Sequence, residues 1–170
     1  MKKIGLLLFV FAALAAASAQ NDRRSAITVS VDGLNCTSSL GAGAFPALSW
    51  TFAATDALST GGTGSGGSAG KTTISTLNIT KRADSCSPLL FNDVVTERHI
   101  KSVTIVQENN RSDVFTVTLS NVIISSYQLG GDQSSPVPTE QIAFAFSKIC
   151  LADSQSGTKA CYNSQTGATF

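Results

Sequence analysis

Alternation of apolar and polar residues recurs along most of the chain, and no other feature restricts its possible folds as much. Successive side chains of a β-strand point to opposite faces, so apolar residues at every second position predict a strand with one buried face. The pattern begins at residues 26–31, where Ile27, Val29 and Val31 share a face. It returns at residues 48–52, 72–81, 103–105, 115–119, 121–127 and 142–146. The chain is therefore expected to be built mainly of β-strands.

Irregularities in the pattern predict where strands bend or end. Ile74 and Leu77 are out of phase with each other, which predicts a β-bulge within residues 72–81. The polar residues 108–113 suit a hairpin turn. Gly130-Gly131 ends the preceding strand before a polar loop.

One segment has helical spacing instead. Ser87 is expected to cap a helix with Pro88 at its first position. Apolar residues follow at helical spacing: Leu89, Leu90, Phe91, Val94 and Val95. We expect this helix to end near Arg98, which gives His99 a capping or dipole-complementing role. Because closing a sheet removes its exposed edges, the expected fold class is all-β, a small barrel or sandwich of about seven to nine strands with one short flanking α-helix.

The first nineteen residues predict a secretory signal peptide. Lys2 and Lys3 precede an apolar run that ends in Ala17-Ser18-Ala19, and this run is too short for a transmembrane helix. Cleavage after Ala19 would leave a single domain, residues 20–170, in the periplasm or outside the cell. Loss of the two lysines changes the formal net charge from +1 to −1. Such a balance indicates neither a nucleic-acid partner nor attachment to a membrane.

All four cysteines lie after the leader, at Cys36, Cys86, Cys150 and Cys161. An even number in an oxidising compartment predicts two disulfides, and four cysteines allow three connectivities. We favour Cys36 with Cys86 and Cys150 with Cys161, because the last two flank a short polar turn. Metal binding is not expected, since no pair has C-x-x-C spacing and the chain has one histidine.

Residues 59–70 are almost entirely Gly, Ser and Thr and predict a protruding loop. Its glycines and the lysine after them are Gly61, Gly62, Gly64, Gly66, Gly67, Gly70 and Lys71. A phosphate loop would need a glycine where Ser65 stands, and it would need a strand before it and a helix after it. No nucleotide or other cofactor is therefore expected.

No residue is assigned a catalytic role. The carboxylates are scattered along the chain, and His99 is the only histidine available as a general base. The protein is therefore not expected to be an enzyme. The glycine-rich loop and a sheet coated with Thr and Ser suit self-association.

The order of these features resembles the haemolysin-coregulated protein (Hcp) family, the tube protein of type VI secretion. The resemblance is carried by Leu48-Ser49-Trp50, Ala69-Gly70-Lys71, Thr80-Lys81, Asp84, Ser87-Pro88-Leu89, VIISSY at residues 122–127, Gly130-Gly131 and EQIAFAFSKI at residues 140–149. It spans nearly the whole chain after the leader.

The resemblance implies a small β-barrel beside one helix, hexameric rings that stack into a tube, and no catalytic residues. The loop at about residues 56–70 would then contact neighbouring subunits. The partners would be further copies of this chain, with a protein cargo or effector as a possible guest in the lumen. Two alternatives are a monomeric secreted binding module that kept the barrel and a secreted hydrolase that uses His99.

Overall fold

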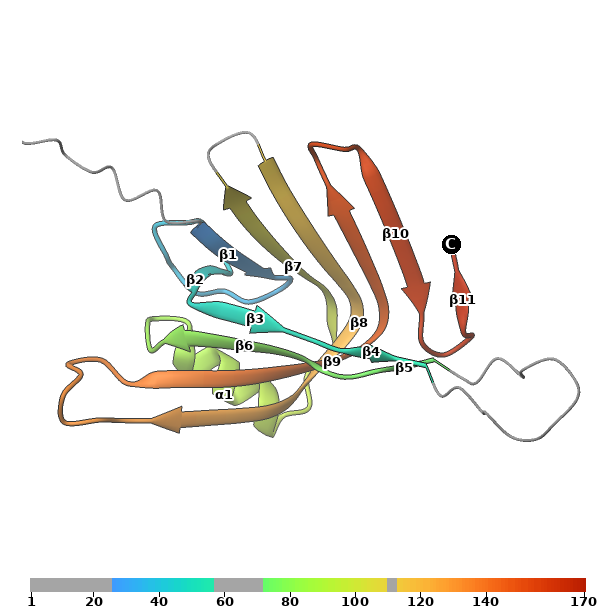
Figure 1. Ribbon diagram of the computed structural model, residues 1–170. Coiled ribbons are helices and arrows are strands. Elements are labelled where there is room, and N and C mark those ends of the chain that lie inside the picture. The colour runs from blue at the N-terminus through green and yellow to red at the C-terminus, as the bar shows by residue number, and fades with distance from the viewer. Residues whose placement is uncertain (1–25, 57–71, 110–112) are drawn as a thin grey trace, which may run out of the picture.

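A computed structural model describes residues 26–56, 72–109 and 113–170 (Figure 1). The predicted leader and the glycine-rich loop from Gly61 to Lys71 lie outside these ranges. Within them the chain forms one helix and eleven strands. The strands are β1 (Ala26–Val31), β2 (Ala44–Ala47), β3 (Ser49–Thr51), β4 (Ala54–Thr55), β5 (Thr73–Ile74), β6 (Leu77–Arg82), β7 (Ile100–Asn109), β8 (Asp113–Gly130), β9 (Thr139–Asp153), β10 (Thr158–Asn163) and β11 (Ala168–Thr169), and the helix is α1 (Ser87–Val95).

Nine of these strands form one antiparallel sheet in the order β11-β10-β9-β8-β7-β1-β2, with β6 paired to β9 and β3 paired to β6. The all-β fold with one helix is confirmed. The closed form of the predicted barrel is wrong, because no ladder in the described residues joins β2 to β3 or β6. The chain itself links the two ends of the sheet through Leu48, whose N–H donates to the Thr80 carbonyl at 2.8 Å. Pro46 in β2 has no N–H to donate, which limits further pairing there.

The long strands β8 and β9 bend in their middle and serve both layers of the fold (Figure 1). Leu119 and Ile149 are buried on one side of the bend, whereas Val122 and Phe144 are buried on the other, so the phase of the buried positions changes. Asn121 lies between them with φ of 52°, a left-handed conformation that asparagine tolerates. The bend places the two halves of each strand in different layers around one core.

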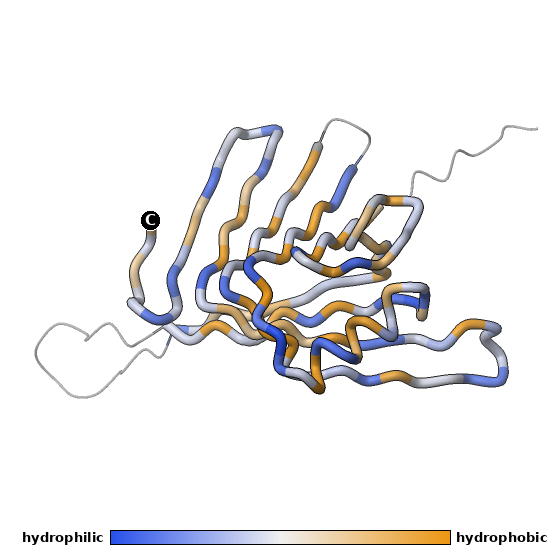
Figure 2. Tube along the Cα trace, turned by 180° about the vertical axis from the view of Figure 1, so that it is seen from behind, coloured by the Kyte–Doolittle hydropathy of each residue, from blue (hydrophilic) through white to orange (hydrophobic). Residues whose placement is uncertain are grey.

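The core gathers side chains from both layers and from the helix. Figure 2 shows apolar residues recurring along the strands. Its fully buried members include Val29, Phe45, Leu77, Leu90, Ile105, Leu119 and Phe144. Leu90 inserts α1 into the same cluster, so the helix is part of the core.

The structure confirms most of the predicted strands. β1 has the predicted bounds, and the chain is irregular between Ile74 and Leu77, where β5 and β6 separate. Asn109 pairs with Asp113 across the predicted hairpin, and β8 ends at Gly130. The strands β2, β4, β10 and β11 were not predicted.

The helix differs from its prediction at both ends. Its N-cap is Cys86, and Ser87 is already helical. Its last residue is Val95. At its carboxyl end, the N–H groups of Thr96, Glu97 and Arg98 donate to helix carbonyls, so the capping role predicted for His99 falls to these residues.

Candidate functional site

The predicted assembly loop departs from a short ribbon formed by β4 and β5. Thr55 pairs with Thr73 in this ribbon, which is separate from the main sheet. Ser75 fastens its base, because its Oγ accepts from the Ala53 N–H at 2.8 Å and its own N–H donates to the Ala53 carbonyl at 2.8 Å. The described flanks of the loop are thus held together, while the loop glycines themselves lie outside the described residues.

Two disulfides are present, in the connectivity that the sequence favoured. Cys36 is bonded to Cys86, and this bond joins the loop after β1 to the N-cap of α1 with a Cα–Cα distance of 5.0 Å. Cys150 is bonded to Cys161, its directly opposite partner across β9 and β10, with a Cα–Cα distance of 4.1 Å. One bond therefore fixes the helix and the other fixes the C-terminal strands.

A buried ion network lies where α1 meets the sheet. Lys81 and Glu140 are direct partners across β6 and β9, and both are 0% exposed. Lys81 Nζ lies 3.0 Å from Glu140 Oε2 and 2.9 Å from Asp84 Oδ1. It also donates to Ser87 Oγ at 3.2 Å. We call these four residues, with Tyr127, the buried network.

Two aromatic rings complete the surroundings of these charges. The Phe45 ring centroid lies 5.1 Å from Lys81 Nζ, within range of a cation–π interaction. The Tyr127 hydroxyl donates to Glu140 Oε1 at 3.0 Å. Burial, followed by this hydrogen bond, raises the pKa of Tyr127 to about 12.

The buried network is a structural element and not an open binding site. Its central charges have no contact with solvent, and no buried side-chain nitrogen or oxygen in the described part of the chain lacks a hydrogen-bond partner. Because Lys81 binds Ser87 of the helix and Glu140 of the sheet, the network sets the position of α1. A buried pair with satisfied partners favours one arrangement, since displacing either group leaves a buried charge alone.

The sequence analysis did not single out these charges, although a signal was present. Lys81 continues the buried phase of Leu77 and Ile79 along β6. Glu140 likewise shares its phase with Ile142 on β9. A charged residue in the apolar phase of each of two strands is the pattern that would have indicated a buried pair.

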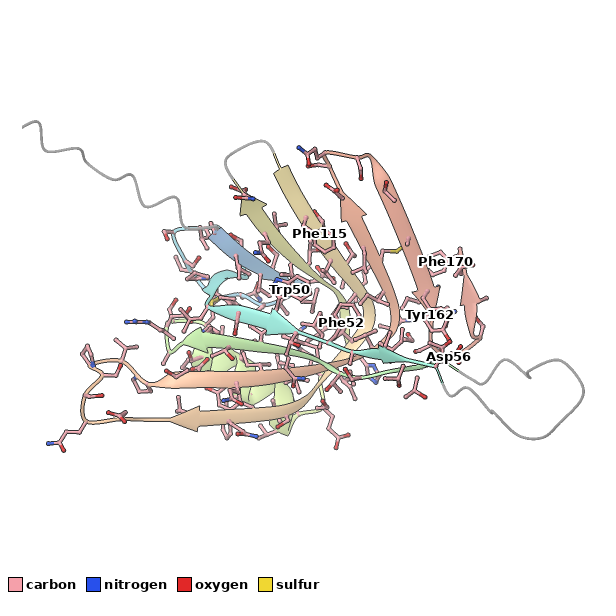
Figure 3. The ribbon with its side chains drawn as sticks, viewed as in Figure 1. Trp50, Phe52, Asp56, Phe115, Tyr162 and Phe170 are labelled. Carbon is pink, nitrogen blue, oxygen red and sulfur yellow. A yellow bond between two sulfur atoms is a disulfide. The ribbon has the colours of Figure 1, made fainter. Side chains whose placement is uncertain are left out.

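A second feature is a set of four half-exposed aromatic residues, Trp50, Phe52, Phe115 and Tyr162, which we call the aromatic cluster. Figure 3 shows them in the space between β3 and the sheet of β8 to β10. The Trp50 ring lies 6.2 Å from the Phe52 ring and 6.2 Å from the Phe115 ring, and both pairs are nearly parallel. Trp50 Nε1 donates to Gln107 Oε1 at 2.9 Å. This hydrogen bond joins the indole of β3 to a side chain of β7.

A third feature is the outer side of α1. Leu89, Phe91 and Val95 are exposed there, and we call these three residues the helix face. The Phe91 ring lies 5.8 Å from the Tyr127 ring, so the helix face adjoins the buried network. The only charged residue of the helix, Asp93, is buried and accepts two hydrogen bonds from Arg98.

The described residues assemble no metal centre. Among them, no group of three or more His, Cys, Asp or Glu side chains could hold a metal ion. His99 is exposed beyond the end of α1. None of the helices in the described ranges has the length and apolar character that crossing a membrane requires.

The described chain is a curled antiparallel sheet with one helix held against it by buried charges, which places it in the all-β class. A sequence comparison gives its family. Residues 22–152 match the family described as "Type VI secretion system effector, Hcp". The chain therefore belongs to the Hcp family, and the resemblance noted in the sequence is confirmed. No curated protein matched the chain.

Solved structures agree in fold. The chain is similar to Hcp1 from Salmonella typhimurium, with a TM-score of 0.70, 20% identity and coverage of 86% of this chain and 99% of that one. It is also similar to a type VI secretion system effector from Yersinia pestis, with a TM-score of 0.64, 22% identity and coverage of 81% and 98%. Identities this low establish the shared fold, and the family match establishes membership.

Proposed function

We propose that the protein is a structural component of Hcp type, whose copies associate into hexameric rings that can stack into a tube. The observation that carries the proposal is the family match over residues 22–152. The fold supports it, since two solved structures described as type VI secretion system proteins share it along nearly their whole length. We propose an architectural and not an enzymatic role, because the charges of Lys81 and Glu140 are buried in the network that seats α1.

We further propose that the mature protein works after export, in the periplasm or outside the cell. Two observations support this. The leader has the basic, apolar and small-residue segments of a Sec signal cleaved after Ala19. All four cysteines are paired in disulfides, which persist in oxidising compartments. The glycine-rich loop on the β4–β5 ribbon is proposed to contact neighbouring copies, and the lumen of a ring to admit a protein cargo.

The oligomeric state of the oxidised protein beginning at Gln20 tests ring formation. Size-exclusion chromatography with multi-angle light scattering should give the mass of a hexamer, and electron microscopy should show rings or stacks. A clean monomer at high protein concentration would contradict the proposal and favour the monomeric binding module. Deletion of residues 60–70 should reduce assembly, whereas an unchanged oligomer would exclude a contact role for the loop.

A further inference from the structure

We propose that neighbouring copies associate by packing the helix face of one copy against the aromatic cluster of the next. The inference rests on the proposed ring formation and identifies the two surfaces that would make the contact. Each surface is apolar and incompletely covered, and they lie on different parts of the same chain.

The helix face is unusual for a surface helix, which normally presents polar residues to water. Phe91 is 53% exposed and Val95 is 60% exposed, and their i, i+4 spacing places them side by side. No charged side chain of α1 is exposed, because Asp93 is buried against Arg98. Asn92 is the one exposed polar residue of α1, so the helix presents a mainly apolar surface without a charge that would have to be desolvated on contact.

The aromatic cluster lies at the end of the core face of the sheet, where the described residues cover that face incompletely. Phe115 stands on the same face of β8 as the buried Val117 and Leu119, yet it is 37% exposed. The rings of Trp50 and Phe52 from the β3 segment cover this face only in part. An apolar sheet face is stable when another layer covers it, and a helix is one of the two elements that can do so.

In the described part of one copy, the helix face and the aromatic cluster do not meet. The helix face touches Tyr127, whereas Phe115 lies twelve positions earlier on the same strand. At about 3.3 Å per residue, this separates the two surfaces by up to about 40 Å along β8. A second copy of the chain carries the matching surface, because the described part of each copy has one helix face and one aromatic cluster. Contacts between two different patches of one chain generate rings when the rotation closes.

Charge variants test the two surfaces separately. In the mature oxidised protein, Phe91→Glu and Phe52→Glu should each abolish the ring peak in light scattering, because each buries a carboxylate in the contact. Leu48→Glu is the matched control: Leu48 is 54% exposed but belongs to neither surface, so its ring should persist. Near-ultraviolet circular dichroism checks that each variant is folded.

A photo-crosslinking residue at position 91 gives a readout that does not depend on the folding of a cluster variant. Crosslinked peptides should join position 91 to β3 or to the first half of β8 in another copy, and the same probe at position 48 should not do so. If the wild type forms rings but crosslinks from position 91 reach only other segments, or both charge variants still assemble, this inference is overturned while the proposed function stands. A wild type that remains monomeric would instead overturn the proposed function.

Discussion

Two ends of the molecule each carry a disulfide, and the bonds act in different settings. At the helix end, Cys36–Cys86 ties a loop to the N-cap of α1, which no sheet ladder holds. At the C-terminal end, Cys150–Cys161 joins residues that are already partners in the β9–β10 ladder. The first bond therefore helps to position an element, whereas the second reinforces a pairing that hydrogen bonds already specify.

The buried network is a further difference between the helix end and the C-terminal end. At the helix end, ion pairs and a disulfide converge on α1, and the loop closed by Cys36–Cys86 has a sequence separation of 50. The corresponding separation at the C-terminal end is 11, and Lys159 of β10 is exposed. The helix end should thus dominate the free energy of unfolding, and the following variants test that expectation.

The largest effect is expected for Lys81→Met. It leaves Glu140 as a buried charge without its cation, which should lower the free energy of unfolding by about 3–5 kcal/mol. Urea titration followed by circular dichroism measures this loss. Lys159→Met at the C-terminal end is the control and should stay within about 0.5 kcal/mol of the wild type. Adding Glu140→Leu to Lys81→Met should recover much of the loss, and a double variant no better than the single would contradict the role assigned to the pair.

Removal of each disulfide compares the two ends directly. The loop-entropy relation predicts losses of about 4 kcal/mol for Cys36→Ser with Cys86→Ser and about 3 kcal/mol for Cys150→Ser with Cys161→Ser. The reason is the longer loop that the first bond closes in the unfolded chain. Urea titration of both double variants measures the losses. A larger loss in the free energy of unfolding on removing Cys150–Cys161 would contradict the expectation that the helix end contributes more stability.

A smaller effect is expected for Tyr127→Phe. Glu140 Oε1 loses the hydrogen bond from the phenol while remaining buried, which should cost about 1–3 kcal/mol. Tyr162→Phe is the control for removal of a hydroxyl, because Tyr162 lies away from the buried network. Urea titration measures both losses in the free energy of unfolding. Equal losses would show that the hydrogen bond from Tyr127 to Glu140 adds no stability beyond that of the Tyr162 hydroxyl.

The smallest effect is a dependence of stability on alkaline pH. The pKa of Tyr127 is raised from 10.0 to about 12, so the folded chain binds this proton more tightly than the unfolded chain does. The resulting stability is complete below about pH 10 and is lost as pH rises toward about 12. Tyr162→Phe leaves Tyr127 as the only tyrosine, and its tyrosinate absorbance should therefore titrate late. A midpoint of this absorbance change near pH 10 would show that burial does not raise the pKa of Tyr127.

Much of the fold could be predicted because the local pattern and the tertiary structure agree. β1 alternates between one buried face and one exposed face, so period alone gave its bounds. The helix was recognisable from Pro88 and the spacing of the apolar residues, although Ser87 turned inward to bind Lys81 instead of capping.

Other features depend on contacts between distant segments. β10 has a single buried residue, Cys161, so its pattern does not indicate a strand until β9 is beside it. The barrel is open because the chain passes at Leu48 from β2, which pairs with β1, to β3, which pairs with β6. The bend in β8 depends on a change in the phase of the buried positions near Asn121. The aromatic cluster joins residues from three strands and the segment after β3, which no local spacing reveals.

The long pairing of β8 with β9, whose register shifts between Ile124 and Ser126, also has a mechanical consequence. Their ladder extends from Phe115 opposite Asp153 to Gly130 opposite Thr139 and runs through both layers. A force directed along these strands loads the hydrogen bonds of the ladder together, in shear, whereas a force across them would open the bonds one after another. If the proposed rings stack, this long hairpin would be the part of each subunit that best resists a load along its strands.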